Sequence, residues 1–370
     1  MLKRGLAVFL FAAFSTLGFA QPPNSHQPKL TPQTSGTTQL LIAVSPVNSQ
    51  VVWAAGTGGT YVLTTDGGNS WKAGVVPGAE NLQFRDVQGV SDQVAYLLSI
   101  GNTPETFRIY RTNDGGGTWQ VEFINQITLA FYDCFAFWSP NRGVAHSDSV
   151  NGVFPELRTF DGENWPTIAP SMPAALPGEA SFAASGTCIT TQGEGNAWIA
   201  TGGATTARIL ATTDAGNTWN AYDTPLLSSP SAGGISVAFR DGSNGVVGGG
   251  DLSNNASAQF ARSSDGGQTW NLTAKPPVNG AIFCLAYANG MTLAEDQDKA
   301  KATDQNFDRT VVVTAEAQPN YDSGPAAWTP DEGNTWYKLP GANGYWAVGF
   351  ADPQDGWFVG NNGQILKISF

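Results

Sequence analysis

A short segment that ends in tryptophan recurs along the chain and limits the folds that the chain can adopt. Five copies follow the pattern Ser/Thr-x-Asp-x-Gly-x-Ser/Thr-Trp and begin at residues 64, 112, 212, 263 and 329, and a shortened copy spans residues 159–165. The aspartate and tryptophan of the six copies are Asp66 and Trp71, Asp114 and Trp119, Asp161 and Trp165, Asp214 and Trp219, Asp265 and Trp270, and Asp331 and Trp336. Consecutive aspartates are 47 to 66 residues apart, so each copy belongs to its own repeat unit.

The chemistry of this motif, the Asp-box, favours a structural role. The aspartate can accept backbone N–H hydrogen bonds within its own turn, and glycine supplies the positive φ that a tight turn needs. The tryptophan can cover the hairpin and bury a large apolar area. Identical carboxylates spread around a ring cannot converge on one substrate. We therefore expect the six aspartates to be structural, and no residue is assigned a catalytic role.

Short apolar segments bounded by glycine precede each box, and the composition agrees with them. The 44 Gly, 22 Pro and 12 Trp, with only 13% charged residues, are typical of many short strands joined by tight turns. Units of about 50 residues predict an all-β, seven-bladed β-propeller with four-stranded antiparallel blades over residues 40–370. The last blade lacks a box and a fourth strand. We expect residues 21–39 to be a flexible lead-in that supplies this strand and closes the ring.

The first twenty residues carry the features of a signal peptide. Lys3 and Arg4 precede an apolar run over residues 6–14, and Ala20 ends a cleavage site of small residues. We expect cleavage after Ala20 and export to the periplasm or out of the cell. No later apolar run is long enough to span a bilayer, so membrane insertion is not expected. A net charge of −12 excludes a general nucleic-acid binder that neutralises phosphates.

The boxes, together with Gly-Trp-Phe-Val-Gly-Asn-Asn-Gly at residues 356–363, resemble the bacterial Asp-box (BNR-like) propellers grouped with the photosystem II stability/assembly factors. The resemblance covers nearly all of residues 40–370. It implies an exported seven-bladed scaffold that binds a protein or another ligand and has no agreed catalytic residues, and it does not imply photosynthesis. We expect no cofactor and no metal, since no dinucleotide-binding glycine motif and no metal-ligand spacing is found.

A more distant resemblance to sialidase-like propellers leaves a glycoside hydrolase open as a second function. The segment from Phe107 to Tyr110 is similar to the Phe/Tyr-Arg-Ile-Pro motif of those enzymes, but it lacks the proline and precedes the second box. The alternative is an ordinary strand. Arg111, Arg158 and Arg262 precede their boxes at one equivalent position and are interpreted as rim residues. A concave, arginine-lined pocket with a tyrosine or two carboxylates would favour the hydrolase, and a broad face would favour binding.

Four long loops, at residues 147–156, 169–181, 248–259 and 315–326, are expected on the face opposite to the boxes. Long ordered loops on one face commonly carry function, so we expect a partner protein or an anionic or carbohydrate ligand there. The candidate ligand-binding residues are Arg85, Arg108, His146, Asp148, Glu179, Arg208, Asp251, Asn254 and Asp322. The three arginines would suit a carboxylate or an acidic peptide, and the alternative is that each pairs with a local acidic residue.

The three cysteines, Cys134, Cys188 and Cys284, occupy equivalent positions in three of the expected blades. Equivalent atoms of neighbouring blades should be separated by about 10 Å, the spacing of packed sheets, whereas a disulfide needs Cα atoms within about 7 Å. We therefore expect three reduced, buried thiols with no disulfide and no metal. Near the channel the inner strands approach one another, so distances there are shorter than this spacing. A monomer is expected.

Overall fold

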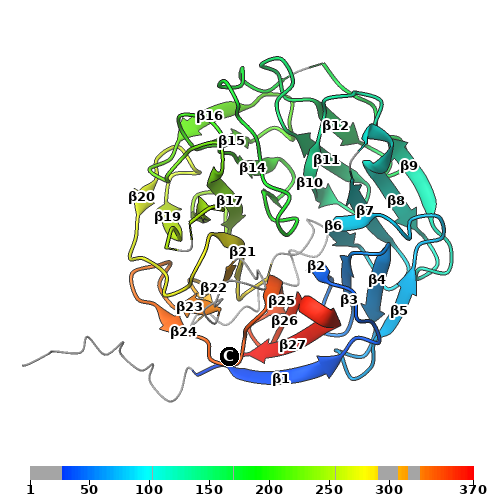
Figure 1. Ribbon diagram of the computed structural model, residues 1–370. Coiled ribbons are helices and arrows are strands. Elements are labelled where there is room, and N and C mark those ends of the chain that lie inside the picture. The colour runs from blue at the N-terminus through cyan, green and yellow to red at the C-terminus, as the bar shows by residue number, and fades with distance from the viewer. Residues whose placement is uncertain (1–26, 102, 170, 255, 291–306, 316–325) are drawn as a thin grey trace, which may run out of the picture.

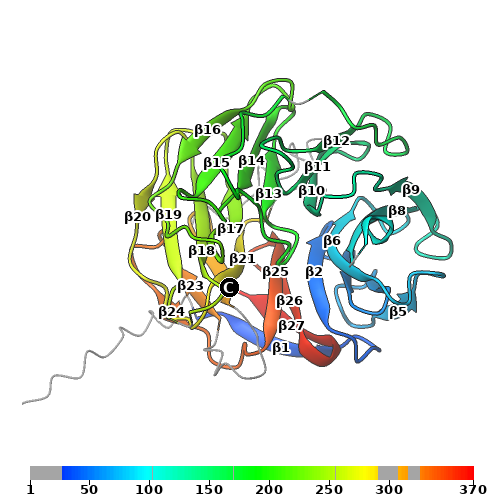
Figure 2. The same cartoon turned by 45° about the horizontal axis from the view of Figure 1, so that its top comes forward.

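The computed structural model describes residues 27–101, 103–169, 171–254, 256–290, 307–315 and 326–370. Within these ranges the strands form seven antiparallel sheets, which stand as blades around a common centre (Figures 1 and 2). The fold is a seven-bladed β-propeller, as the repeats predict.

The first strand of each blade is the innermost, and the next strands follow outward. Blade 1 contains β2 (Leu41–Pro46), β3 (Val52–Gly56), β4 (Thr60–Thr64) and β5 (Lys72–Val75). Blade 2 contains β6 (Gln83–Gly89), β7 (Ala95–Ile100), β8 (Arg108–Thr112) and β9 (Gln120–Ile124). Blade 3 contains β10 (Tyr132–Ser139), β11 (Arg142–Ser147) and β12 (Glu156–Thr159). Blade 4 contains β13 (Ile189–Gln192), β14 (Asn196–Ala200), β15 (Arg208–Thr212) and β16 (Asn220–Asp223).

The remaining blades follow the same order. Blade 5 contains β17 (Ala232–Phe239), β18 (Gly245–Asp251), β19 (Gln259–Ser263) and β20 (Asn271–Leu272). Blade 6 contains β21 (Ile282–Tyr287), β22 (Val311–Ala315), β23 (Ala327–Thr329) and β24 (Tyr337–Lys338). Blade 7 contains β25 (Tyr345–Asp352), β26 (Asp355–Gly360), β27 (Gln364–Ser369) and, from the other end of the chain, β1 (Lys29–Thr34).

Strand β1 closes the ring from the segment before residue 40. It pairs antiparallel with β27, from Lys29 opposite Ser369 to Thr34 opposite Gln364. In Figure 1, β1 (blue) accordingly lies along the outer edge of β27 (red). The Trp71 indole Nε1 of the blade 1 box also donates to Gln33 Oε1 of β1 at 3.0 Å. The first blade and the last blade are therefore joined through β1.

Blade 3 departs from the expected four strands. Outside β12 the structure has an isolated bridge between Leu157 and Thr167. The Arg158 N–H also donates a hydrogen bond to the Pro166 carbonyl at 3.4 Å, and the Ile168 N–H donates to the Glu156 carbonyl at 3.2 Å. Pro166 has no N–H to donate to a ladder, so residues 166–168 take the place of a regular outer strand.

The box turns satisfy their aspartates locally. In blade 1 the Thr64 hydroxyl donates to Asp66 Oδ1 at 2.8 Å and accepts the Gly68 N–H at 2.9 Å. The Ser70 N–H donates to Asp66 Oδ1 at 2.9 Å, and its hydroxyl donates to Oδ2 at 2.6 Å. The bonds from Ser70, followed by that from Thr64, lower the pKa of Asp66 to about 2. The hydrogen bond from the Ser/Thr hydroxyl to the aspartate carboxylate recurs in all six boxes. These carboxylates are therefore hydrogen-bonded within their own turns.

The Thr212 hydroxyl of the blade 4 box offers a test of this turn. Thr212→Val is expected to lower the free energy of unfolding by about 1–3 kcal/mol, because valine cannot accept the buried Gly216 N–H that Thr212 Oγ1 accepts at 3.0 Å. Equilibrium urea unfolding measures the change. Thr212→Ser is the control and should stay close to the wild type, since Ser263 fills the same position in blade 5. Equal losses in the two variants would contradict the role of the hydroxyl.

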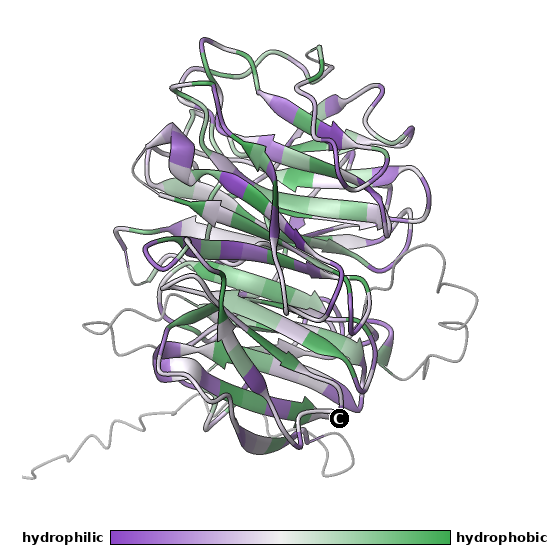
Figure 3. Cartoon of the chain, turned by 90° about the vertical axis from the view of Figure 1, so that its right-hand side faces the viewer, coloured by the Kyte–Doolittle hydropathy of each residue, from purple (hydrophilic) through white to green (hydrophobic). Residues whose placement is uncertain are grey.

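Apolar side chains fill the spaces between blades. Figure 3 shows the apolar residues along the strands of successive sheets. The box tryptophan of blade 2, Trp119, packs edge-on against Tyr61 of blade 1 with ring centroids 5.1 Å apart. Trp198 of blade 4 stacks on Phe239 of blade 5 at 3.6 Å. In the described part of the chain, no helix is both long and apolar enough to cross a membrane.

Side chains on the inner strands also join neighbouring blades. Asp86 Oδ2 on β6 accepts the Phe135 N–H of β10 at 2.9 Å. Ser236 Oγ on β17 accepts the Leu285 N–H of β21 at 3.0 Å. These side chains reach the neighbouring blade, because inner strands lie close together around the centre.

The expectation of three reduced thiols is therefore wrong. Cys134 on β10 and Cys188, which directly precedes β13, form a disulfide with Cα atoms 6.2 Å apart, inside the limit of about 7 Å. The expectation used the spacing between packed sheets, but the inner strands converge, and Thr191 Oγ1 reaches the Phe137 carbonyl at 2.6 Å. Cys284 is a buried free thiol.

Candidate functional site

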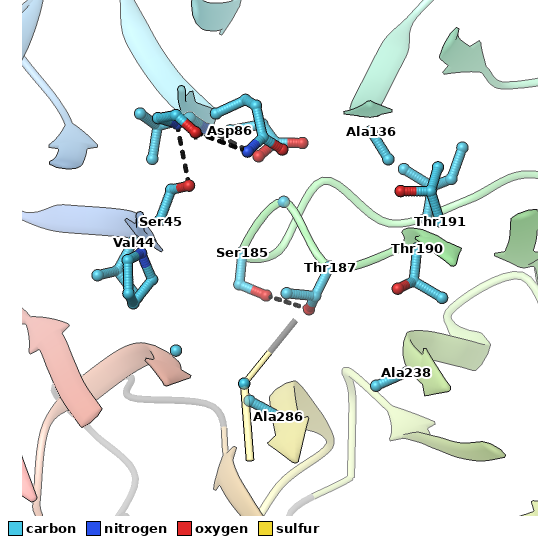
Figure 4. Close-up of a pocket in the computed structure, with 18 of the residues that line it drawn as sticks. Val44, Ser45, Asp86, Ala136, Ser185, Thr187, Thr190, Thr191, Ala238 and Ala286 are labelled. Atoms are coloured by element: carbon cyan, nitrogen blue, oxygen red, sulfur yellow. Dashed lines mark hydrogen bonds between the residues drawn. The ribbon is translucent and has the colours of Figure 1, made fainter. Parts of the chain in front are cut away.

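Residues 181–188, between blades 3 and 4, cross the centre of the ring, and we call them the plug. The Ser185 hydroxyl of the plug donates to the Phe283 carbonyl of blade 6 at 2.7 Å. The Ala183 carbonyl accepts a hydrogen bond from Arg85 of blade 2 at 3.1 Å. In Figure 4, Ser185 accordingly lies between the inner strands that surround it. The plug ends at the disulfide to β10.

Two pockets lie on either side of the plug. The mouth pocket has a volume of about 350 Å³ and is lined by Arg85, Phe131, Asp133, Asp148, Ser181, Phe182, Ala183, Ala184, Leu252, Phe283 and Trp346. The inner pocket has a volume of about 190 Å³ and is lined by plug residues 185–187 and by inner strands of the blades (Figure 4).

The inner pocket offers no free charge to a ligand among its described residues. Asp86 accepts the Val87 N–H at 2.7 Å as well as the bond from β10. Burial raises the pKa of Asp86 well above its usual range, which favours the neutral acid. The Tyr287 hydroxyl donates to Glu332 Oε1 at 3.1 Å. We therefore take the mouth pocket as the candidate site.

The mouth pocket lies toward the face opposite to the box turns. Asp148 follows β11 and Leu252 follows β18, so both lie where a second strand ends. Box turns follow third strands, which run antiparallel to second strands and end at the other face. The loops at residues 147–156 and 248–259 thus contribute to this pocket, and the plug continues the loop at residues 169–181.

Arg85 is a partly buried cation with no acidic partner in the described residues. Its Nη1 donates to the Ala183 carbonyl and its Nη2 to Gln83 Oε1, both at 3.1 Å. Its Nε is buried and has no acceptor there. The guanidinium lies over the Trp346 ring, 5.4 Å from the centroid, and burial lowers its pKa. A carboxylate would complete these hydrogen bonds and balance the charge.

Asp133 and Asp148 form the second polar feature of the mouth pocket. Both carboxyl groups line the pocket and interact with each other, and Asp148 Oδ1 accepts the Ser181 N–H at 2.9 Å. Burial and then the neighbouring Asp148 raise the pKa of Asp133 well above its usual range, and burial raises the pKa of Asp148 to about 6. The two groups titrate as a pair. The pair is neutral below about pH 6 and carries one negative charge above it.

The structure brings two other candidates, Arg208 and Glu179, together outside the mouth pocket. Arg208 Nε donates to Glu179 Oε1 at 2.9 Å, and Arg208 Nη2 bonds to Oε2. Glu179 is buried and also accepts the Thr201 hydroxyl at 2.7 Å. This arrangement is the pairing of an arginine with a local acidic residue that the sequence leaves open.

Arg108 also lies outside the mouth pocket. Its Nε donates to the Glu105 carbonyl at 2.7 Å, and its Nη1 donates to the Tyr110 hydroxyl at 3.3 Å. Arg85, Arg108 and Arg208 therefore lie in different environments, and of the three only Arg85 lines the pocket.

The remaining candidates do not line the mouth pocket. His146 is buried against Phe154 with ring centroids 5.1 Å apart, and burial lowers its pKa to about 3. Asp251 accepts hydroxyl and amide hydrogen bonds from nearby serines. Asn254 Oδ1 accepts the Ala256 N–H in the same loop. Asp322 lies outside the described residues. No group of three or more His, Cys, Asp or Glu that could hold a metal ion occurs in the part of the chain that the structure describes.

Sequence reasoning missed Asp133 and the aromatic wall of the mouth pocket. The wall is formed by Phe131, Phe182, Phe283 and Trp346. These residues lie near the start of an inner strand or in the plug, where the sequence pattern does not distinguish them from core residues. Asp133 lies in an otherwise apolar inner strand, and this is the signal that could have identified it. A carboxylate is rarely buried unless it is paired or has a function.

The fold and this central pocket define a propeller with a plugged centre, and the comparisons agree with the propeller fold. No protein-family model matches the chain, and no curated protein matches its sequence. The solved structure of YCF48 bound to D1 peptide matches with a TM-score of 0.63 and 17% identity, over 96% of this chain and 100% of that one. YCF48 from Cyanidioschyzon merolae matches with a TM-score of 0.60 and 16% identity, over 92% of this chain and 98% of that one. The chain is thus similar in fold to this photosystem II assembly factor, as the boxes predict.

Proposed function

We propose that this chain is an exported, non-catalytic propeller that binds an acidic segment of a partner protein in the mouth pocket. The observation that carries the proposal is Arg85, a partly buried guanidinium that donates to two neutral acceptors and whose Nε lacks an acceptor among the described residues. Desolvating a charge without a counter-charge is unfavourable, so an incoming carboxylate would gain both charge neutralisation and hydrogen bonds. Export rests on the signal-peptide features of residues 1–20, which lie outside the described residues.

A peptide is the form of ligand that fits the pocket. A volume of about 350 Å³ accommodates one or two side chains and no folded domain. The aromatic wall suits an apolar residue beside the acidic one. The solved structure of YCF48 with a D1 peptide provides an example of this fold with a peptide bound. The rest of the partner would contact the long loops around the pocket, and the chain would act as a monomer.

One observation favours the alternative, a glycoside hydrolase: two carboxyl groups and an arginine share one pocket. Glycosidases separate their two carboxyl groups by about 5 Å or more to hold the scissile bond between them. The carboxyl groups of Asp133 and Asp148 instead interact directly and titrate as a pair. Arg111 and Arg158 pair with Glu163 and Glu156. The geometry therefore supports binding better than hydrolysis.

Arg85→Gln is expected to weaken binding of an acidic peptide at least tenfold, because it removes the pocket's positive charge. The probe is a fluorescein-labelled decapeptide in which two glutamates flank a phenylalanine, and the affinity is measured by fluorescence anisotropy. The same peptide with glutamines should bind the wild type at least tenfold more weakly. Arg108→Gln is the matched control, since Arg108 also donates to neutral acceptors but lies outside the pocket. Equal affinities of the wild type and Arg85→Gln would rule the proposal out.

A further inference from the structure

We infer that the mouth pocket takes up its anionic ligand together with a proton, which the Asp133–Asp148 pair holds. The inference rests on the proposed function, since it concerns the same pocket and the same ligand charge. It adds that the site responds to pH within the neutral range.

Among the described residues, three titratable side chains set the charge of the mouth pocket. Arg85 comes from β6, Asp133 from β10 and Asp148 from the end of β11. The plug, β21, β25 and the loop after β18 contribute only serine, alanine, leucine, phenylalanine and tryptophan to its described lining. With the acid pair neutral, the pocket carries the single positive charge of Arg85. When the pair ionises, that charge is cancelled.

The acid pair and Arg85 both form hydrogen bonds with the plug. The Ala183 carbonyl accepts from Arg85 Nη1 at 3.1 Å. Asp148 holds the start of the plug through the Ser181 N–H at 2.9 Å. The anion-binding group and the proton-binding group therefore share one wall of the pocket.

The coupling follows from the charges. An anion at Arg85 lies in a buried pocket beside the pair and disfavours its ionised form, so ligand binding raises the affinity of the pair for a proton. By linkage, a proton on the pair raises the affinity for the anion to the same extent. The pKa of Asp148, about 6, places this exchange between pH 5.5 and 7.5. Above that pKa the affinity can fall by up to about tenfold per pH unit for one coupled proton.

The experiment uses 3-phenylpropane-1-sulfonate, an apolar anion whose own charge is constant over this range. Its affinity for the full chain is measured by NMR chemical-shift titration from pH 5.5 to pH 7.5. The wild type is expected to lose affinity about tenfold over this range. Asp133→Asn/Asp148→Asn, which leaves Arg85 as the only titratable group in the described lining, should bind with an affinity that does not change with pH. Asp148→Asn alone serves as a second variant, and thermal melts check that each variant is folded.

The outcomes separate the two proposals. Binding of the sulfonate with a pH-independent affinity in the wild type would overturn the proton coupling and leave the proposed function standing. The same pH dependence in the folded double variant would also overturn it, because the acid pair would then not be its source. No binding at pH 5.5, where the pocket is most positive, would overturn both. Neutral 3-phenylpropanamide controls for the apolar wall and should show no pH dependence.

Discussion

Removing the Cys134–Cys188 disulfide is expected to lower the free energy of unfolding by about 4 kcal/mol. The bond closes a loop with a sequence separation of 54 residues, and a loop of this length restricts the unfolded chain by about that amount in the chain-entropy model. The loop contains the whole plug except its last residue. Cys134→Ala/Cys188→Ala should therefore show the loss in equilibrium urea unfolding, and it should also weaken ligand binding at the mouth pocket, whose wall the plug forms.

Cys284→Ser is the matched control for the disulfide. Cys284 Sγ accepts the Val348 N–H at 3.3 Å, and Ser236 makes the corresponding bond in blade 5, so serine should be tolerated to within about 1 kcal/mol. Alkylation of the denatured, unreduced protein should label one cysteine by mass spectrometry, and reduction should raise the number to three. Three labels without reduction would show that the bond does not form.

Deleting β1 is expected to have an effect of similar or larger size. A variant that begins at Leu40 should lose at least about 3 kcal/mol of stability, because β27 loses its backbone partners from Gln364 to Ser369 and each lost hydrogen bond contributes about 1 kcal/mol. Trp71 also loses its bond to Gln33. A new exposed edge at β27 should promote association. Thermal melting and light scattering measure the two effects.

A variant that begins at Gln27 is the control for this deletion, since it keeps β1 and removes only residues that precede the described part of the chain. It should melt at the temperature of the chain that begins at Gln21. If the Leu40 variant also melts there, β1 does not stabilise the ring, and closure must come from packing between blades 1 and 7 alone.

The blades could be predicted from the sequence because each box is a local structure. Thr64, Asp66, Gly68 and Ser70 form their bonds within one turn, so the residues that make the turn are also neighbours in the sequence. The strand that closes the ring could be anticipated too, since a blade that ends at Phe370 lacks one partner. Blade 3 was expected to have four strands. Pro166 has no N–H for a strand ladder, and an isolated bridge takes the place of the fourth strand there.

The candidate site could be predicted only in part, because its residues come from different blades. Arg85 and Asp148 were expected in the site, and both line the mouth pocket. Arg208 was expected there as well, but Glu179, 29 residues earlier in the sequence, pairs with it. Sequence spacing does not show which acidic group a folded loop brings to an arginine.

By itself the sequence determined the repeat unit, the number of blades and the origin of the closing strand, because hydrogen bonds within a turn and the alternation of short strands depend on neighbouring residues. Only the tertiary structure decided what fills the centre. Inner strands converge there, so spacings taken from packed sheets fail, and Cys134 meets Cys188. The plug meets Asp148 through the Ser181 N–H although the two residues are 33 positions apart in the chain. The site therefore forms only in the folded chain, where Arg85 and the Asp133–Asp148 pair meet the plug.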